Sequence, residues 1–174
     1  MEFFDIYDAY GNKTGRQVPH GYKLQDGEYR FISHLLIFNS KDELLIQKRA
    51  EDKYDWPGYY DLSAGGGVNA GETSYQAAKR ECKEELGLDI DFDDRPYMRV
   101  YFPNGFDDYF MTDCDVDLDK VKMQAEEVLE VKWATKEEII QMQKDKTFVN
   151  YNAGFIDFLF AQRKNRGTYL KWNT

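Results

Sequence analysis

Residues 80–87 of this chain read R-E-C-K-E-E-L-G, which places three carboxylates within a few positions of one another. On a helix, residues three and four apart are neighbours, so Glu81, Glu84 and Glu85 would repel one another by roughly a few tenths of a kcal/mol per pair. From these eight residues alone, a solvated charged face is the commoner explanation. The other explanation is chemical, because clustered glutamates bind Mg²⁺ or Mn²⁺, and such cations neutralise a diphosphate and activate water.

The spacing assigns different roles to the three glutamates. Glu81 and Glu85, at i and i+4, share one face of the expected helix, and Glu84 lies at the edge of that face. We therefore expect Glu81 and Glu85 to be the main metal ligands and Glu84 to be a supplementary ligand. Glu85 and Glu84 are also candidate catalytic groups, since the water to be activated would be held next to them.

The residues before and after this acidic cluster predict a short strand, a glycine loop and a helix. Residues 60–64 form the expected strand, and the three glycines at 65–67 follow it. Thr73 and Gln76 form a capping box that opens a helix, and Gly87 is suited to end it. The cluster would therefore lie on the last turns of a helix that begins after a glycine loop.

The rest of the chain predicts a mixed α/β fold. Further strands are expected at residues 3–7, 31–38, 44–48, 97–102, 109–116 and 128–133, and further helices at 136–144 and 154–163. Hairpin turns are indicated at 39–42 and at Asn104-Gly105. Strands interspersed with helices favour an α/β sandwich. A chain of 174 residues fits one domain, 1–174.

Composition argues against several classes of protein. With 42% hydrophobic and 32% charged residues, and with no apolar run long enough to span a bilayer, the sequence predicts a soluble globular protein. The start of the chain lacks the features of a signal peptide, so a cytoplasmic location is expected, where Cys82 and Cys114 would stay reduced. A net charge of −9 argues against binding to nucleic acid or anionic membranes.

The spacing around the acidic cluster resembles the signature of the Nudix hydrolase family, G-x5-E-x7-R-E-U-x-E-E-x-G-U, where U is a bulky aliphatic residue. The fixed positions are occupied by Gly66, Glu72, Arg80, Glu81, Glu84, Glu85 and Gly87. Cys82 stands at the first U position, where a small buried apolar residue suffices. The resemblance implies an α/β/α sandwich with a mixed β-sheet between helices. It also implies hydrolysis, with Mg²⁺ or Mn²⁺, of a pyrophosphate bond in a nucleoside diphosphate linked to another moiety.

The same resemblance implies roles for the remaining residues of the motif. By position, the backbone carbonyl of Gly65 would be a further metal ligand. Arg80 and Glu72 would orient the glycine loop against the helix, and Gly66 and Gly87 would be structural. The expected partner is a small phosphorylated substrate, a nucleotide above all, with neither a membrane nor a nucleic acid involved. A homodimer is compatible with the sequence.

Residues 48–58, K-R-A-E-D-K-Y-D-W-P-G, are similar to a segment of type I isopentenyl-diphosphate isomerases, which share the Nudix fold. There, the positions of Arg49 and Lys53 contact diphosphate, although basic residues after a strand are also ordinary surface residues. An isomerase is therefore an alternative function. It is disfavoured because isomerases have a catalytic cysteine where this chain has Gly65 and a metal-binding histidine where it has Gly67. A catalytically silent nucleotide-binding regulatory module is the other alternative.

The identity of the general base is open. Glu127 precedes an expected strand, at a place where many Nudix enzymes carry an extra metal ligand or a base, but an exposed loop acid is an equally good explanation. Asp107 and Asp108 compete for the same role, and Glu84 is a further candidate.

Aromatic residues and histidines give weaker indications. Trp56, Tyr59 and Tyr60 could stack on a nucleobase, but aromatic side chains are more often part of a core. His20 and His34 are expected to be structural.

Overall fold

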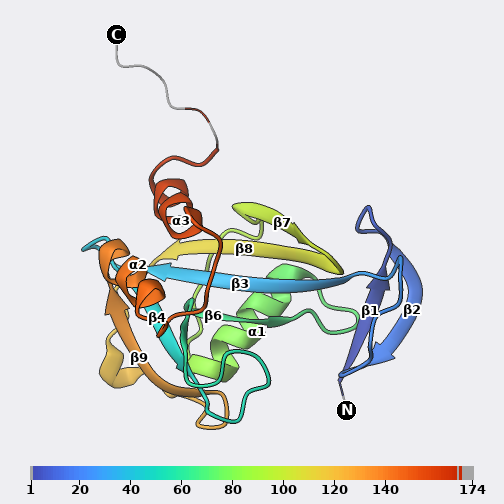
Figure 1. The fold of residues 1–174 in the computed structure, drawn as a ribbon, viewed down its shortest axis with the longest axis horizontal. Coiled ribbons are helices and arrows are strands. Elements are labelled where there is room, and N and C mark those ends of the chain that lie inside the picture. The colour runs from blue at the N-terminus through green and yellow to red at the C-terminus, as the bar shows by residue number, and fades with distance from the viewer. Residues whose placement is uncertain (1, 168, 170–174) are drawn as a thin grey trace.

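The computed structural model describes residues 2–167 and 169, which form a mixed sheet between helices with a separate hairpin at one end (Figure 1). The strands of the sheet are β3 (Arg30–Phe38), β4 (Leu44–Arg49), β5 (Tyr60–Asp61), β6 (Ala64–Gly67), β7 (Met98–Phe102), β8 (Gly105–Asp113) and β9 (Val128–Ala134). Their order is β5-β4-β3-β8-β7, with β6 paired to β3 and β9 paired to β4. β3 and β8 run parallel, and the other pairs are antiparallel.

β3 is the central strand, and its last four residues, 35–38, are fully buried. Such a continuous apolar run is typical of a strand that is covered on both faces. β3 pairs with β4 only at Phe38 and Leu44, and the two strands diverge from there. Further along, β3 pairs with β6, while β4 pairs with β5 and β9. The divergence opens the space in which the candidate site lies.

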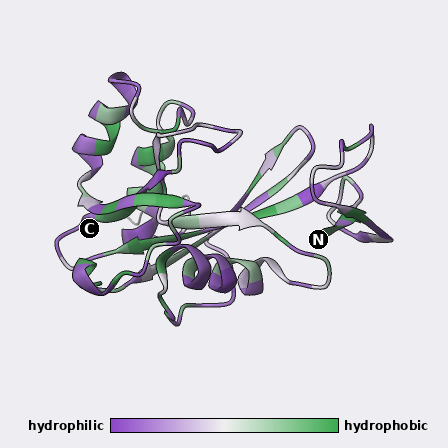
Figure 2. Cartoon of the chain, turned by 90° about the horizontal axis from the view of Figure 1, so that it is seen from below, coloured by the Kyte–Doolittle hydropathy of each residue, from purple (hydrophilic) through white to green (hydrophobic). Residues whose placement is uncertain are grey.

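Helices cover both faces of the sheet, as Figure 2 shows in a view along its plane. α1 (Ser74–Leu86) lies on one face, and α2 (Lys136–Lys144) and α3 (Phe155–Lys164) lie on the other. Buried side chains of α1 pack with Leu35 and Ile37, whereas those of α2 and α3 pack with Leu36 and Phe38. The predicted α/β/α sandwich is confirmed. None of the described helices has the length and apolar character that a membrane span requires.

A hairpin of β1 (Phe3–Tyr7) and β2 (Lys13–Pro19) stands beside the main sheet (Figure 1). It is attached to the segment between β6 and α1, because the N–H of Ala70 donates to the carbonyl of Phe3 at 2.7 Å. In the same segment, the N–H of Gly71 donates to the carboxylate of Asp5 at 2.9 Å. These bonds hold the hairpin next to the glycine-rich strand.

The three predicted helices are confirmed, with α3 lying one residue later than predicted, at Phe155–Lys164. Thr73 is the N-cap of α1, and both hydrogen bonds of the capping box with Gln76 are present. Gly87 ends the helix in the left-handed conformation, with φ of 67°, which glycine adopts at little cost. α2 spans 136–144 as predicted, with a second capping box at Thr135, and α3 begins directly after Gly154.

Some predicted strand boundaries are wrong. Residues 60–64 do not form one strand, and the glycines predicted to form a loop lie in β6. β8 begins at Gly105 instead of 109, so Asp107 and Asp108 lie inside a strand. These charges are tolerated there because each carboxylate has a cationic partner, His34 for Asp107 and Arg99 for Asp108. A short 3₁₀ helix at Leu118–Lys120 was not predicted.

Candidate active site

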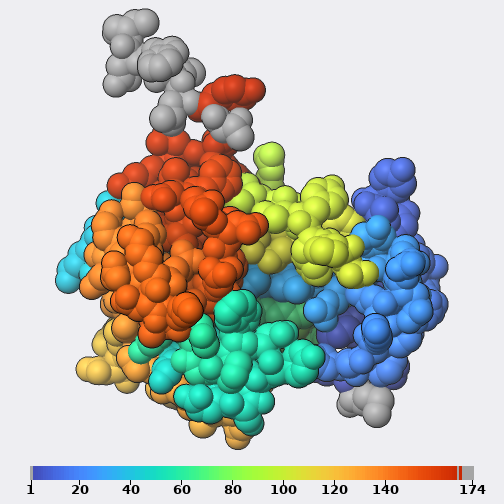
Figure 3. Space-filling view, in the orientation of Figure 1, coloured from blue at the N-terminus to red at the C-terminus, as the bar shows by residue number. Residues whose placement is uncertain are grey.

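A cavity of about 560 Å³ lies between the hairpin, α1 and the diverging strands. Figure 3 shows the surface hollowed between the blue hairpin and the teal segment that follows β4. The cavity is lined by most of the predicted site residues, namely Arg49, Lys53, Gly65, Gly66, Arg80, Glu81, Glu84, Glu85 and Glu127. Glu72 and Gly87 are not among its lining residues. The fold therefore brings together the motif on α1, the segment after β4 and the loop before β9.

The three glutamates of α1 differ in burial along the helix. Glu85 is 6% exposed, the side chain of Glu81 is 15% exposed, and that of Glu84 is 51% exposed. The carboxylate of Glu85 accepts hydrogen bonds from the N–H of Gly65 at 3.1 Å and from the side-chain amide of Gln47 at 3.0 Å. Burial, followed by the charge of Glu81, raises the pKa of Glu85 to about 8. Burial also raises the pKa of Glu81, although Arg80 opposes this.

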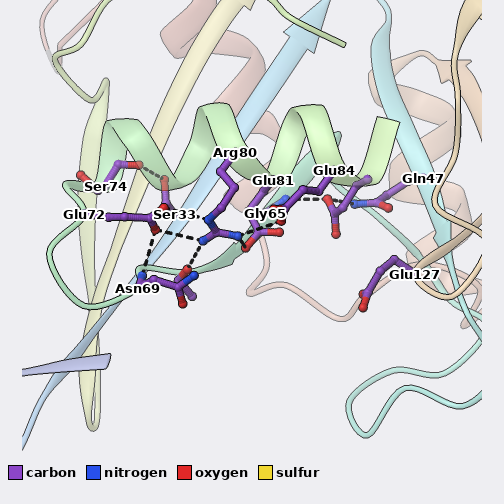
Figure 4. Close-up of polar contacts among 12 residues, drawn as sticks. Ser33, Gln47, Gly65, Asn69, Glu72, Ser74, Arg80, Glu81, Glu84 and Glu127 are labelled. Carbon is purple, nitrogen blue, oxygen red and sulfur yellow. Dashed lines mark hydrogen bonds and ion pairs between the residues drawn. The ribbon is translucent and has the colours of Figure 1, made fainter. Parts of the chain in front are cut away.

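Arg80 connects α1 to the glycine strand and to the segment after it (Figure 4). Its guanidinium donates to the carbonyl of Gly67 and to Glu72, at 2.9 Å each. It also donates to Glu81 at 2.7 Å and to Glu84 at 3.0 Å. Glu72 in turn accepts from the N–H of Asn69. These contacts are those expected of a pair that orients the glycine segment against the helix.

The donor atoms around Glu85 fit a hard divalent cation. The N–H of Gly65 points away from β3 to Glu85, and in a strand the carbonyl of the same residue faces the same edge. The carbonyl of Gly65 therefore faces the glutamates, and an all-oxygen set is what Mg²⁺ prefers. Within residues 2–167 and 169, no three acidic, cysteine or histidine side chains converge as a preformed cluster. Arg80 bonds one oxygen of Glu81 and one oxygen of Glu84, so each carboxylate keeps a second oxygen that could bind a cation.

Each glycine of β6 leaves space for a different neighbour. A Cβ atom at Gly65 would lie 2.4 Å from the ring of His34, and one at Gly66 would lie 2.3 Å from the carboxylate of Glu81. At Gly67 it would lie 2.7 Å from the ring of Phe4. None of the three has a positive φ. Close packing against the rings of His34 and Phe4 therefore restricts positions 65 and 67, whereas at position 66 the neighbour is the flexible end of Glu81.

The two predicted phosphate ligands are held by acidic partners. Arg49 donates to the carbonyl of Asp55 at 3.1 Å and to the carboxylate of Asp61 at 3.4 Å. Lys53 forms an ion pair with Glu127. The candidate base is therefore paired with a candidate substrate ligand, and both face the cavity.

Both histidines also line the cavity, a position that the sequence analysis did not predict. Nδ1 of His34 lies 2.8 Å from the carboxylate of Asp107, and its ring stacks on Tyr109 at 5.1 Å. Burial lowers the pKa of His34, but the charge and hydrogen bond of Asp107, together with the charges of Asp61 and Glu85, outweigh burial and raise the pKa to about 9. In a strand, alternate residues face the same side, so the position of His34 in the predicted strand could have placed it on one face together with Ile32 and Arg30.

The remaining candidates have distinct positions. Asp108 is fully buried, and both its carboxylate oxygens accept from Arg99, so it has a structural position outside the cavity. Trp56 lines the cavity and is 41% exposed. Tyr59 and Tyr60 pack against the core on the side of α2 and α3.

Comparisons with known proteins agree with the fold and the motif. The NUDIX domain family model matches residues 29–157. The chain is 43% identical to "Uncharacterized Nudix hydrolase lin0387" of Listeria innocua, over 97% of this chain and 98% of the relative. The crystal structure of DR0079 from Deinococcus radiodurans superposes with a TM-score of 0.72, at 20% identity, over 92% of this chain and 98% of that one. The chain thus belongs to the Nudix family, whose members hydrolyse pyrophosphate bonds with divalent metal ions, and it is a hydrolase.

A shorter match links the chain to isomerases. The isopentenyl-diphosphate Delta-isomerase of Corynebacterium diphtheriae is 33% identical over 91 residues, which are 52% of this chain and 50% of the isomerase. Side chains at positions 65 and 67, where the resemblance puts the cysteine and histidine of isomerases, would overlap His34 and Phe4. The cavity therefore lacks both groups and the space for them.

Proposed function

We propose that this protein hydrolyses the pyrophosphate bond of a nucleoside diphosphate linked to another moiety, with Mg²⁺ or Mn²⁺ as the cofactor. The observation that supports the proposal is that one cavity is lined by acidic and basic residues from three separate segments, namely Glu81, Glu84 and Glu85 of α1, Arg49 and Lys53 at and after the end of β4, and Glu127 before β9. Its volume is in the range of sites for small ligands. Three expectations from the sequence remain predictions: that the protein is cytoplasmic, that it binds no nucleic acid, and that it can form a homodimer.

In this proposal Glu81, Glu85 and the carbonyl of Gly65 hold the metal, and Glu84 is a supplementary ligand. When bound, the metal would neutralise the diphosphate and lower the pKa of a water molecule. The side-chain amide of Gln47 and the N–H of Gly65 both donate to Oε2 of Glu85, so the position of this carboxylate is set before substrate arrives. Arg80 keeps α1 and β6 in register.

Glu84 and Glu127 are the candidate general bases. Glu127 is paired with Lys53, and a diphosphate that binds Lys53 would replace Glu127 as its partner. Glu127 would then be free to accept a proton within the cavity. Glu84 is more exposed, and Arg80 would keep its bonds to Glu72 and Gly67 if the contact with Glu84 were broken.

Arg49 is expected to bind the diphosphate, and Arg49→Ala should raise KM by about tenfold, since a hydrogen bond to a charged group contributes about 1.5–3 kcal/mol. Its guanidinium lines the cavity and is held in place by Asp55 and Asp61. Steady-state kinetics with the best substrate would measure this. An unchanged KM would make Arg49 an ordinary surface residue.

The decisive experiment is a substrate screen at fixed Mg²⁺, with nucleoside diphosphate sugars, dinucleoside polyphosphates and dinucleotides, scored by the mass of the products. Hydrolysis in ¹⁸O water would then locate the attacked phosphorus. A silent module would bind members of the panel without turnover. Conversion of isopentenyl diphosphate without hydrolysis of any panel member would favour the isomerase and contradict the proposal.

A further inference from the structure

The floor of the cavity beyond the metal-binding residues is one face of β3. Arg30, Ile32 and His34 line the cavity, whereas Phe31 and Ser33 between them are buried on the opposite face. With a rise of about 3.3 Å per residue, the Cα atoms of Arg30 and His34 are roughly 13 Å apart. His34 lies against Gly65 at the metal end, so Arg30 marks the far end of the row.

Arg30 differs from the other lysine and arginine residues of the cavity because it has no acidic partner. Arg49 pairs with Asp61, Lys53 with Glu127, and Arg80 with three glutamates. Among the residues that the structure describes, no carboxylate lies within ion-pair distance of the Arg30 guanidinium, although the side chain is only partly exposed. An arginine stays charged at all relevant pH values, and a desolvated charge favours an anionic partner.

The N-terminal hairpin forms the wall next to Arg30. Phe4 packs on Gly67, whose backbone pairs with Ile32 in the next strand. The ring of His20 lies 5.2 Å from that of Phe4, and both residues line the cavity. This hairpin lies outside residues 29–157, the part matched by the family model. The wall therefore lies outside the matched region and borders the cavity at Gly67, the end of β6 away from Gly65 and Glu85.

We propose that Arg30, in the cavity that Phe4 and His20 also line, binds a second anionic group of the substrate, a phosphate or a carboxylate separate from the diphosphate that is cleaved. The proposal rests on the proposed function, since it takes the cleaved diphosphate to lie at the glutamates of α1. The substrate class is then a nucleoside diphosphate derivative whose far end is anionic. The distance along β3 fits an extended ligand, because the anion at Arg30 and the metal site lie at opposite ends of one row.

The first test measures anion binding without turnover. Inorganic phosphate is titrated into the metal-free full-length protein in EDTA, and backbone amide shifts are followed by NMR. The proposal expects saturable shifts at Arg30, Phe4 and His20, with affinity at least fivefold weaker in Arg30→Gln. Arg95→Gln removes the same charge from an exposed position outside the cavity and should leave the affinity unchanged. Absence of saturable shifts at the three amides, or equal loss in both variants, overturns the proposal.

The second test separates this proposal from the proposed function. KM is compared for UDP-glucuronate against UDP-glucose, which tests a carboxylate, and for NADPH against NADH, which tests a phosphate. Wild-type protein should favour the more anionic member of at least one pair by fivefold or more, and Arg30→Gln should abolish this preference while Arg30→Lys keeps part of it. Hydrolysis with no preference in either pair refutes the anion subsite alone. Phosphate binding that depends on Arg30, without hydrolysis of any compound, refutes the proposed function alone.

Discussion

At the scale of single residues, the site is defined by carboxylates that are crowded and partly removed from water. Glu85 is buried beside Glu81, and its pKa is raised to about 8. Two carboxylates this close together repel each other when no cation is present. A divalent cation bound between them would replace this repulsion with attraction to the cation. The crowding noted in the sequence is therefore greater in the folded protein than on an isolated helix.

Replacing Glu85 by glutamine should lower kcat by about 100-fold or more, because a proposed metal ligand is lost while the shape of the side chain is kept. The oxygen of the new amide can still accept from Gly65 and Gln47, so the fold should persist. The measurements are kcat at saturating Mg²⁺ and thermal melting. Glu137→Gln, on the exposed side of α2, is the matched control. Full turnover in Glu85→Gln would exclude Glu85 from the mechanism.

The contact between Gly65 and His34 predicts a coupled pair of substitutions. Gly65→Ala should destabilise the protein by about 1–3 kcal/mol, as overpacking typically does, because the new methyl group would lie 2.4 Å from the imidazole. In a His34→Ala background the same change should cost much less. Urea unfolding of the two single variants and the double variant measures the coupling. Additive free energies would show that His34 is not what restricts position 65.

At the scale of elements, the site depends on how α1 and the hairpin are fixed to β6. The outer edge of β6 offers the N–H of Gly65 to Glu85 and the carbonyl of Gly67 to Arg80. Its inner edge pairs with β3. A single short strand therefore positions both the acidic face of α1 and the floor of the cavity. The hairpin is attached one segment further on, through Phe3 and Asp5.

Asp5 should make the hairpin sensitive to acid. Burial raises its pKa, but hydrogen bonds from Gly71, Lys13 and Gln17 together lower it below 3.8. A lowered folded pKa contributes stability that is present above the unfolded pKa and is lost as the pH falls through the folded value. Protection factors of the hairpin amides in hydrogen exchange should thus be constant from pH 7 to about pH 5 and fall below about pH 4.

The matched variants are Asp5→Asn and Asp26→Asn. Asp5→Asn should lower hairpin protection already at neutral pH, by about 1–3 kcal/mol, since a buried charged hydrogen-bonding group is replaced. Asp26 lies exposed in the loop after the hairpin, and its substitution should have no effect. Unchanged protection in Asp5→Asn would show that the backbone bonds alone hold the hairpin.

At the scale of the whole molecule, a protein of net charge −9 must attract an anionic substrate to a cavity that is itself rich in acids. Among the basic residues of that cavity, Arg49, Lys53 and Arg80 are already paired with acids. Cations from solution are the remaining source of positive charge at α1. Metal binding is therefore expected to precede or accompany substrate binding.

Mg²⁺ should stabilise the folded protein, because the proposed ligands are brought together only in the native state and not in the unfolded chain. At 100 times its Kd a ligand contributes about 2.7 kcal/mol, which is a rise in Tm of roughly 5–10 °C for a chain of this size. The rise should be lost in Glu85→Gln. Sodium chloride at matched ionic strength controls for screening of the net charge. An equal rise with sodium chloride would argue against a specific metal site.

Local sequence patterns alone determined the chemistry and the main helix. The spacing of Glu81, Glu84 and Glu85, the capping box at Thr73 and the stop at Gly87 depend on residues within one or two turns of each other, and such patterns can be recognised in a sequence. The strand character of Gly65 to Gly67 was missed, because glycine has a low strand propensity and pairing with β3 overrides it.

Only the tertiary structure decided what surrounds that chemistry. The cavity joins residues from Glu2 to Tyr151, and its walls come from the hairpin, β3 and the segment after β4 together. The pairing of Lys53 with Glu127, the contact of His34 with Gly65 and the lack of an acidic partner for Arg30 arise between elements far apart in the chain. Burial and charge at such contacts depend on the packed fold, and no local pattern specifies them.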